Sequence, residues 1–525
     1  MHDLDPHHIF ELGLIMVMIA AGITAIAKKF KQPYPIALVV VGAIIGLVNI
    51  PALEPLKSFI TEGEVFNFVI ITLFLPALLG EAGLKLPFAH IYENKTPVLA
   101  LAFGGTLLSF IVVGFSSMWL LQLSIPVAFV FAALMSATDP VSVLSIFKSV
   151  GVNKRLATVI EGESLFNDGL AVVLFNISAF SLLQYVDLGF EGIGLGIWEF
   201  VKVITLGLII GGALGFGVSR LTRHFDDYPL EIIFSIILFY GAYLLAESVG
   251  ASGVIAVVVS ALVLGNYGAK IGMSPTTRLN ISNFWDVAAL LANSLVFLMV
   301  GLEITRINVA DKWGLIFIAI LIVLVARSVA VYSSLLFIKN FPNPWKHILN
   351  WGGLKGSLSI ALVLSLPDDF AGREEILIMA FSVVLFSLVF QGLSIKPLIS
   401  LLGVKKQERG YKDYRELISR SYRYETAIEE IMKVKKNLLI TETVAKEIID
   451  KYELGITNAQ RGVEQLLEKY PNLKEKQQTV LHKHSLYAQH DAIDRLLKEG
   501  IITNDIAEKE QASITNKLVE LDNDQ

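Results

Sequence analysis

Hydrophobic residues dominate thirteen stretches of the chain, each of about 16 residues or more and each bounded by proline, glycine or charged residues. A helix needs about 20 predominantly apolar residues to cross the hydrocarbon core of a bilayer, so stretches of this length favour membrane-spanning helices. They lie at about 9–27, 35–50, 65–83, 97–121, 126–147, 157–184, 196–219, 230–248, 252–267, 284–302, 313–338, 346–366 and 374–402. The pattern predicts an all-α polytopic membrane protein with about thirteen transmembrane helices.

Lysine and arginine are distributed unevenly between alternate loops of this arrangement. Fifteen of them flank one side of the expected helices, whereas five flank the other side: Lys57, Lys202, Arg306, Lys312 and Arg373. Basic residues in short loops accumulate on the cytoplasmic side of a membrane. We therefore expect a multi-pass protein of the cell (plasma) membrane, with the N-terminus outside and the C-terminus in the cytoplasm.

The last part of the chain has a different composition from the rest. Residues 405–525 hold 43 of the 91 charged residues, and their apolar residues recur at helical spacing. This pattern predicts a transmembrane domain over 1–404 and a helical cytosolic tail over 405–525. Whether the tail serves regulation, dimer stability or trafficking stays open. Turns in the tail are expected at Leu454-Gly455, Pro471-Asn472 and Glu499-Gly500.

Two of the expected membrane helices contain polar interruptions. In the helix over 126–147, Asp139 precedes a proline, which lacks an amide donor and disfavours helical conformation at the residue before it. In the helix over 346–366, three glycines weaken the helix around Lys355. These helices are seven spans apart and cross the membrane in opposite directions, which predicts an inverted repeat with paired discontinuous helices. We expect Asp139 to face positive helix N-termini and Lys355 to face negative C-termini.

The sixth expected helix contains two carboxylates, Glu163 and Asp168. A charge near the bilayer centre costs at least about 2.5–3.5 kcal/mol, so such residues usually face a protein interior or a water-filled path and carry ions or protons. At about 100° per residue, Glu163 and Asn167 share one helix face, and Ser164 and Asp168 share the adjacent one. Asp168 is expected to face a cavity with Ser164 beneath it. Glu163 needs a cationic partner on a neighbouring helix, and Arg327 is the candidate.

Other chemistries find little support in the sequence. The chain has no cysteine, which excludes disulfides and thiolate metal sites, and it contains no nucleotide-binding, EF-hand or nucleic-acid recognition motif. An intramembrane enzyme is disfavoured because the chain lacks His-Glu-x-x-His and Gly-x-Ser-x-Gly motifs. We expect no catalytic residue, no cofactor and no nucleic-acid partner. A cation channel is the stronger rival to a coupled transporter, because it too would place polar residues at the bilayer midplane.

Taken together, four motifs resemble those of a known family. The chain is similar to the monovalent cation:proton antiporters of the NhaP type, which are related to the eukaryotic sodium/proton exchangers. The resemblance covers about residues 9–402 and rests on Phe74-Leu75-Pro76-Ala77-Leu78-Leu79-Gly80-Glu81, Thr138-Asp139-Pro140, Glu161-Gly162-Glu163-Ser164-Leu165-Phe166-Asn167-Asp168-Gly169 and Trp351-Gly352-Gly353-Leu354-Lys355-Gly356. The family usually has arginine at the position of Lys355. Lysine keeps the charge there but loses the bidentate fork.

This resemblance implies a secondary active transporter that exchanges Na⁺, or Li⁺ or K⁺, for H⁺ by alternating access. It implies that Asp168 binds either the cation or the proton, that Thr138, Ser164 and Glu163 contribute to the ion site, and that Asn167 goes with electroneutral 1:1 exchange. It also implies a homodimer in which a core domain moves against a dimerisation domain. A K⁺-preferring antiporter is a further alternative, because the candidate ligands are all hard oxygens.

Several of these residues also have a structural interpretation. The buried charges of Glu163 and Arg327 can satisfy each other without an ion, and we favour that pairing over direct ligation of a cation by Glu163. Asp139 and Lys355 are expected to compensate helix dipoles rather than to bind the transported ion. Glu81, at the inner end of the third expected helix, is either an interfacial carboxylate or part of a cytoplasmic funnel.

Overall fold

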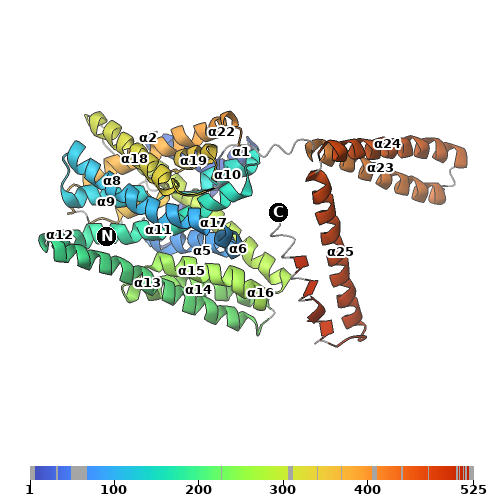
Figure 1. Ribbon diagram of the computed structural model, residues 1–525, viewed down its shortest axis with the longest axis horizontal. Coiled ribbons are helices and arrows are strands. Elements are labelled where there is room, and N and C mark those ends of the chain that lie inside the picture. Colours follow the sequence, from blue (N-terminus) through green and yellow to red (C-terminus); the bar gives the residue numbers. More distant parts are fainter. Residues whose placement is uncertain are drawn as a thin grey trace. The chain divides into compact units, whose positions relative to one another are not determined.

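The computed structural model describes residues 6–30, 33–48, 68–225, 227–304, 311–339, 341–367, 369–404, 411–438, 441–470, 472–503, 506–507, 509–511, 513–514 and 517–518. Within these residues the regular structure is entirely helical. The chain separates into two compact units, Met1–Lys405 and Lys406–Gln525 (Figure 1). The expected basic residues Lys57 and Arg306 lie outside the described residues, as do the span ends 49–50 and 65–67.

The first unit is built from helices, some of which continue into short π-helical segments (η). They are α1 (Pro6–Lys29), α2 (Tyr34–Leu47), η2 (Phe68–Phe74), α5 (Leu75–Lys85), α6 (Phe88–Glu93), α7 (Lys95–Leu99), η3 (Ala100–Gly105), α8 (Thr106–Leu120), α9 (Ile125–Ser136), α10 (Val141–Val150), α11 (Lys154–Asn176), η4 (Ile177–Ser181), α12 (Leu182–Asp187), α13 (Phe190–Thr222), α14 (Tyr228–Ser248), α15 (Gly253–Val263), η5 (Leu264–Gly268), α16 (Ala269–Ile271), α17 (Pro275–Ile304), α18 (Trp313–Ser334), α19 (Asn343–Trp351), α20 (Ser357–Leu364), α21 (Arg373–Phe386), η6 (Ser387–Gln391) and α22 (Gly392–Leu401).

Each of the thirteen predicted stretches coincides with one of these helices or with consecutive ones. Among the described residues, ten helices are long and apolar enough to cross a membrane. Another predicted stretch is the shorter apolar helix α2, and the one at 346–366 is split between α19 and α20. The prediction of an all-α polytopic membrane protein is thus confirmed.

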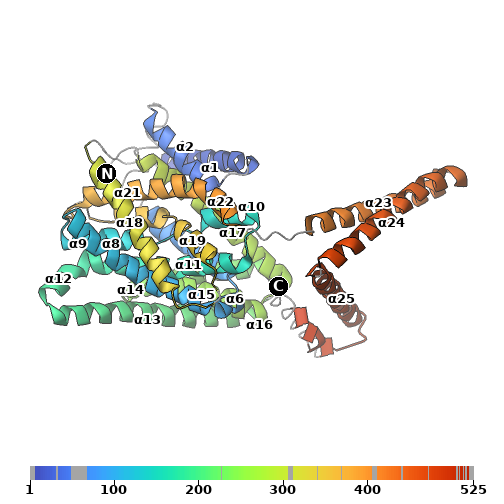
Figure 2. The same cartoon turned by 45° about the horizontal axis from the view of Figure 1, so that its top comes forward.

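Both predicted helix interruptions are present. The first separates α9 from α10 at residues 137–140, where Ala137 has extended backbone angles. The second separates α19 from α20 at residues 352–356. In Figure 2 α13 runs along one edge of the unit, whereas most residues of the broken-helix segments α9 and α20 are buried. The interrupted helices are therefore covered by protein, which is where a bilayer tolerates non-helical backbone.

Glycine residues allow the closest helix contacts in the unit. A Cβ atom on Gly301 of α17 would lie 2.9 Å from the Cα atom of Gly42 on α2, so the two backbones touch at this crossing. On α13, the glycines at 207, 211 and 215 face α15, where added Cβ atoms would meet backbone atoms of Ser252, Ala256 and Ser260. Membrane helices associate through such close packing because lipid provides no hydrophobic driving force between them.

The second unit contains α23 (Tyr411–Leu438), α24 (Glu442–Lys469) and α25 (Asn472–Lys498), and α23 packs against α24. These residues are helical, as the spacing of apolar residues predicted. A turn is present at Gly500, whose φ is +69°, whereas Pro471 lies outside the described residues. The predicted turn at Leu454-Gly455 was wrong, because these residues lie inside α24. Gly455 instead makes room for a neighbouring ring, since a Cβ there would lie 2.5 Å from the ring of Tyr424 on α23.

Candidate functional site

The two helix interruptions bind each other through their backbones. The amide of Asp139 donates a hydrogen bond of 2.8 Å to the carbonyl of Leu354. The amide of Lys355 donates to Ser387 Oγ in η6 at 3.0 Å. Extended backbone in a membrane leaves amides without helical partners, and each unsatisfied group is costly. We call the place where residues 137–140 meet residues 352–356 the crossing. There, tertiary hydrogen bonds satisfy backbone amides that have no partner within their own interrupted helix.

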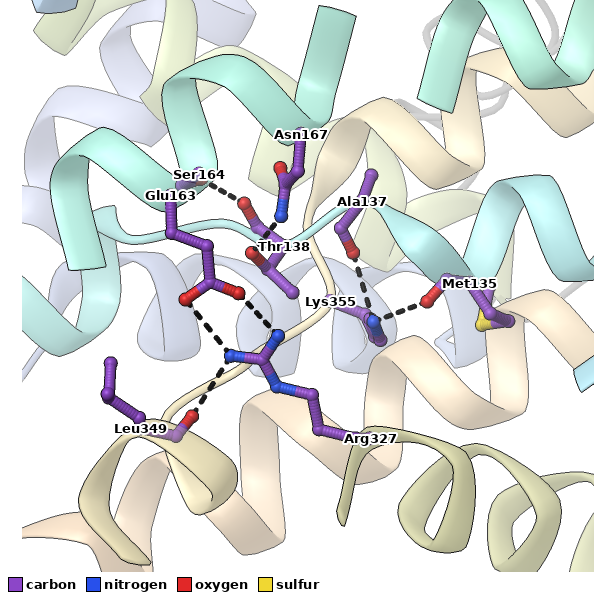
Figure 3. Close-up of polar contacts among 9 residues, drawn as sticks. All are labelled: Met135, Ala137, Thr138, Glu163, Ser164, Asn167, Arg327, Leu349 and Lys355. Carbon is purple, nitrogen blue, oxygen red and sulfur yellow. Dashed lines mark hydrogen bonds and ion pairs between the residues drawn. The ribbon is translucent and has the colours of Figure 1, made fainter. Parts of the chain in front are cut away.

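Beside this crossing, Lys355 lies at the C-terminal end of one helix and Asp139 at the N-terminal end of another. The buried ammonium of Lys355 donates to the carbonyls of Met135 and Ala137 at 2.5 and 3.1 Å, at the C-terminal end of α9 (Figure 3). Asp139 Oδ1 accepts a hydrogen bond of 3.0 Å from the amide of Val141, the first residue of α10. The cation thus faces a negative helix end and the carboxylate a positive one. This is the arrangement that the sequence predicted.

The glycines around Lys355 provide space rather than unusual backbone angles. A Cβ atom on Gly353 would lie 2.5 Å from Nε of Arg327, and one on Gly356 would lie 2.5 Å from Cβ of Asp139. Gly356 has a φ of −108°, which any residue can adopt. The sequence interpretation, in which glycine acts by weakening the helix, is therefore incomplete. These positions are glycine because charged side chains pack directly against the backbone.

One face of α11 closes over the first interruption. Ser164 Oγ donates to the carbonyl of Thr138, and Asn167 Nδ2 donates to Thr138 Oγ1 at 2.6 Å (Figure 3). All three side chains are buried. Beside this interruption, Asn167 Oδ1 and Asp139 Oδ2 have no hydrogen-bond partner among the described residues. Buried polar atoms usually have partners, so acceptors left open beside a carboxylate fit a site for a proton, water or cation.

Asp168 follows Asn167 on the next face of α11. Its side chain is only partly buried, in contrast to the buried side chains of Ser164 and Asn167. It lies within electrostatic range of both Asp139 and Lys355. Asp168 therefore lies beside the crossing without being fully buried. Its neighbours on α11, Ser164 and Asn167, bind Thr138 of the first interruption.

Glu163 lies on the side of α11 that faces α18. Its two carboxylate oxygens accept hydrogen bonds of 2.5 and 3.2 Å from the two terminal nitrogens of Arg327, and Arg327 also donates to the carbonyl of Leu349 at 3.0 Å. The exposed fractions of Glu163 and Arg327 are 2% and 8%. The predicted ion pair is present, is bidentate and connects α11, α18 and α19. Because Arg327 occupies both oxygens, the geometry supports a structural role for Glu163.

Glu81 lies outside this cluster. Its carboxylate is 2.8 Å from the ammonium of Lys85, one turn further along α5, and Lys85 also pairs with Asp286 of α17. Both sequence interpretations of Glu81, an interfacial carboxylate or a funnel residue, are compatible with this position.

Sequence reasoning missed several groups that complete the site. Ser387 binds the backbone of Lys355, and Ser359 Oγ donates to the carbonyl of Leu134 at 2.6 Å. Serine occurs throughout the apolar stretches, so no pattern distinguishes these two. The backbone carbonyls that bind Lys355 carry no sequence signal at all.

The buried ion pair predicts an asymmetric response to mutation. Arg327→Met should destabilise the protein by about 3–5 kcal/mol, because Glu163 is left charged and buried without its partner. The double variant Glu163→Leu/Arg327→Met should regain much of this loss, since no charge remains uncompensated. Thermal unfolding of purified protein in detergent measures both effects. Arg420→Gln removes an exposed pair with Glu416 and serves as the control that should change little. An Arg327→Met variant as stable as the native chain would contradict the prediction.

Comparison with known proteins agrees with this geometry. A family model described as "Sodium/hydrogen exchanger, transmembrane" matches residues 3–401. The chain is 72% identical over 524 residues to the Na(+)/H(+) antiporter NhaG of Bacillus atrophaeus, with 100% of each chain covered. It is 54% identical over 398 residues to the Na(+)/H(+) antiporter NhaH of Halobacillus dabanensis, covering 76% of this chain and 99% of that relative.

A solved structure also shares the fold. The sodium proton antiporter MjNhaP1 from Methanocaldococcus jannaschii at pH 8 superimposes with a TM-score of 0.61 at 22% sequence identity, over 75% of this chain and 98% of that one. The family model and the sequence relatives lead to one assignment. The chain belongs to the sodium/hydrogen exchanger family.

Proposed function

We propose that the protein exchanges Na⁺ for H⁺ across the membrane and that Asp168 carries either ion in turn. The observation that carries this proposal is a partly exposed carboxylate beside two crossed helix interruptions, with unpartnered acceptor oxygens next to it. Membership of the exchanger family and relatives named as Na⁺/H⁺ antiporters support the choice of ions.

The side chains around Asp168 suit a small alkali cation. Ser164 uses its hydroxyl hydrogen to bind the carbonyl of Thr138, which leaves the lone pairs of Ser164 Oγ free to face a cation. Thr138 Oγ1 accepts from Asn167 and keeps remaining acceptor capacity. Neutral oxygens of this kind, together with one carboxylate, replace water around a hard cation. Li⁺ and K⁺ would use the same ligands.

Charge balance around the site supports electroneutral 1:1 exchange. Asp139 and Glu163 carry two negative charges, and Arg327 and Lys355 carry two positive ones, so these four cancel. Asn167 adds no charge. Asp168 is then neutralised by either one proton or one Na⁺, and the loaded site has the same net charge in both cases. Moving it across the membrane would do no net work against the voltage.

Transport then requires the site to open to each side in turn. Rocking of the helices that hold the crossing against the rest of the unit is the movement that fits a fixed site at the bilayer midplane. We further propose a homodimer in the cell membrane, with the N-terminus outside and the tail, 405–525, in the cytoplasm. The uneven distribution of lysine and arginine supports this orientation.

Asp168→Asn should abolish Na⁺-driven proton movement in proteoliposomes, because the amide cannot take up a proton or supply a negative charge. The variant should keep its thermal unfolding midpoint, since the side chain has almost the same shape. Asp187→Asn, at the exposed end of α12, is the matched control and should transport normally. Exchange that persists in Asp168→Asn would exclude this residue as the carrier.

Proton competition should appear in the pH dependence of Na⁺ affinity. Lowering the pH protonates Asp168, and the protonated carboxyl group cannot bind Na⁺. The apparent KM for Na⁺ should therefore rise by about tenfold per pH unit once the acid form dominates. The maximal rate should change much less. Initial rates of radioactive Na⁺ uptake, measured at equal pH on both sides, test this expectation. A KM that stays constant across the titration would contradict competition for one carboxylate.

The rate of electroneutral exchange should not depend on the membrane potential. A K⁺ diffusion potential imposed with valinomycin is expected to leave the initial exchange rate unchanged, and a planar bilayer containing the protein should carry no Na⁺ current. A voltage-dependent rate would indicate a different stoichiometry. A current without coupled proton movement would instead identify a channel.

A further inference from the structure

Lys85 lies between two carboxylates that come from different helices. Its ammonium is 2.8 Å from Glu81 Oε1 on α5 and forms a second ion pair with Asp286 on α17. The side chains of Lys85, Glu81 and Asp286 are 32%, 24% and 49% exposed. The group is therefore partly exposed, where the last residue of α5 meets α17. It carries a net charge of −1, and it would carry −2 without the lysine.

A single aromatic ring positions both carboxylates. Gly80, which precedes Glu81, has no Cβ and lets the ring of Phe239 on α14 pack against its backbone. Trp285, which precedes Asp286, packs on the same ring with a centroid distance of 4.7 Å and donates from Nε1 to Ser235 Oγ at 2.9 Å. Phe239 and Trp285 are almost fully buried. Glu81 and Asp286 thus project from fixed backbone, and their mutual position does not depend on Lys85.

Tyr34 connects this group with the ion site. The charges of Glu81 and Asp139 both act on the hydroxyl of Tyr34, the first residue of α2. Asp139 in turn lies within electrostatic range of Asp168. Tyr34 is therefore within electrostatic range of both Glu81 and Asp139. An ion approaching Asp168 from the side of Glu81 experiences the field of Glu81 and Asp286.

We propose that Lys85 is a tethered cation that limits how strongly Glu81 and Asp286 attract Na⁺ toward Asp168 from the predicted cytoplasmic face. This inference rests on the proposed exchange at Asp168. A negative potential at an entrance raises the local concentration of cations and is screened by salt. The ammonium of Lys85 reduces that potential permanently, because it is covalently attached and cannot diffuse away. Lys85 is therefore a residue that determines apparent affinity, without contacting the transported ion.

A purely structural role is the alternative for Lys85. Partly exposed ion pairs contribute little to stability, whereas α5 and α17 are already joined by the packing around Phe239. A structural tether predicts lower stability and unchanged affinity after removal of Lys85. The electrostatic role predicts changed affinity with stability nearly constant. Measuring both stability and apparent Na⁺ affinity therefore distinguishes the two roles.

Lys85→Gln in the full-length protein tests the inference. In inverted membrane vesicles, which expose the cytoplasmic face, its apparent KM for Na⁺ should fall about two- to fivefold at low ionic strength. The difference should vanish when N-methylglucamine chloride, which is not transported, raises the ionic strength. Asp286→Asn should shift the KM in the opposite direction, and Lys85→Arg should match the native chain. Lys95→Gln is the matched control, because exposed Lys95 lies 4.2 Å from the centroid of the Tyr92 ring.

The outcomes separate this inference from the proposed function. Native exchange combined with an unchanged KM in Lys85→Gln would overturn the inference and leave Asp168 as the carrier. A KM shift that persists at high ionic strength, or that Lys95→Gln reproduces, would also overturn it. Absence of Na⁺/H⁺ exchange in the native protein would refute the proposed function itself.

Discussion

The backbone contact between the two helix interruptions is the constraint on which the site depends. Inside a bilayer there is no solvent to satisfy an amide or carbonyl that leaves a helix. The Asp139 to Leu354 hydrogen bond and the contact of Lys355 with the α9 carbonyls provide those partners within the protein. Substitutions at the crossing therefore affect backbone satisfaction and ion chemistry at the same time.

Charges near the crossing differ in how tightly they are held. Glu163 is fixed on both oxygens by Arg327, and Lys355 by two carbonyls. One carboxylate oxygen of Asp139 accepts a hydrogen bond from the backbone amide of Val141, the first residue of α10. Among the described residues, no hydrogen bond or ion pair holds the carboxylate of Asp168, which is not completely buried. The fixed charges create a constant field around Asp168, the residue that we propose takes up a proton or Na⁺.

Sequence patterns predicted the helices and the interruptions because both follow from local chemistry: apolar length, a proline after Asp139, and a charge among glycines at Lys355. The Glu163 and Arg327 pair was predictable because unpaired charges are rare in spans. Phe239, Ser359 and Ser387 were not, since their roles arise from tertiary neighbours that leave no periodicity. The turn predicted at Gly455 was wrong for the same reason. Glycine often indicates a turn, but here it provides space for the ring of Tyr424, a tertiary neighbour.

The π-helical segment η6 has a consequence for how this helix can vary. A π turn accommodates one residue more than a regular α turn, so it absorbs an extra residue without turning the rest of the helix. Ser387, the first residue of η6, binds Lys355, while Gln391, at its other end, donates to the carbonyl of Trp351 at 3.3 Å. Both ends of the segment therefore contact the same broken helix. An insertion or deletion between Ser387 and Gln391 would turn one of the two side chains away from it, because residues one position further apart or closer together no longer share that face.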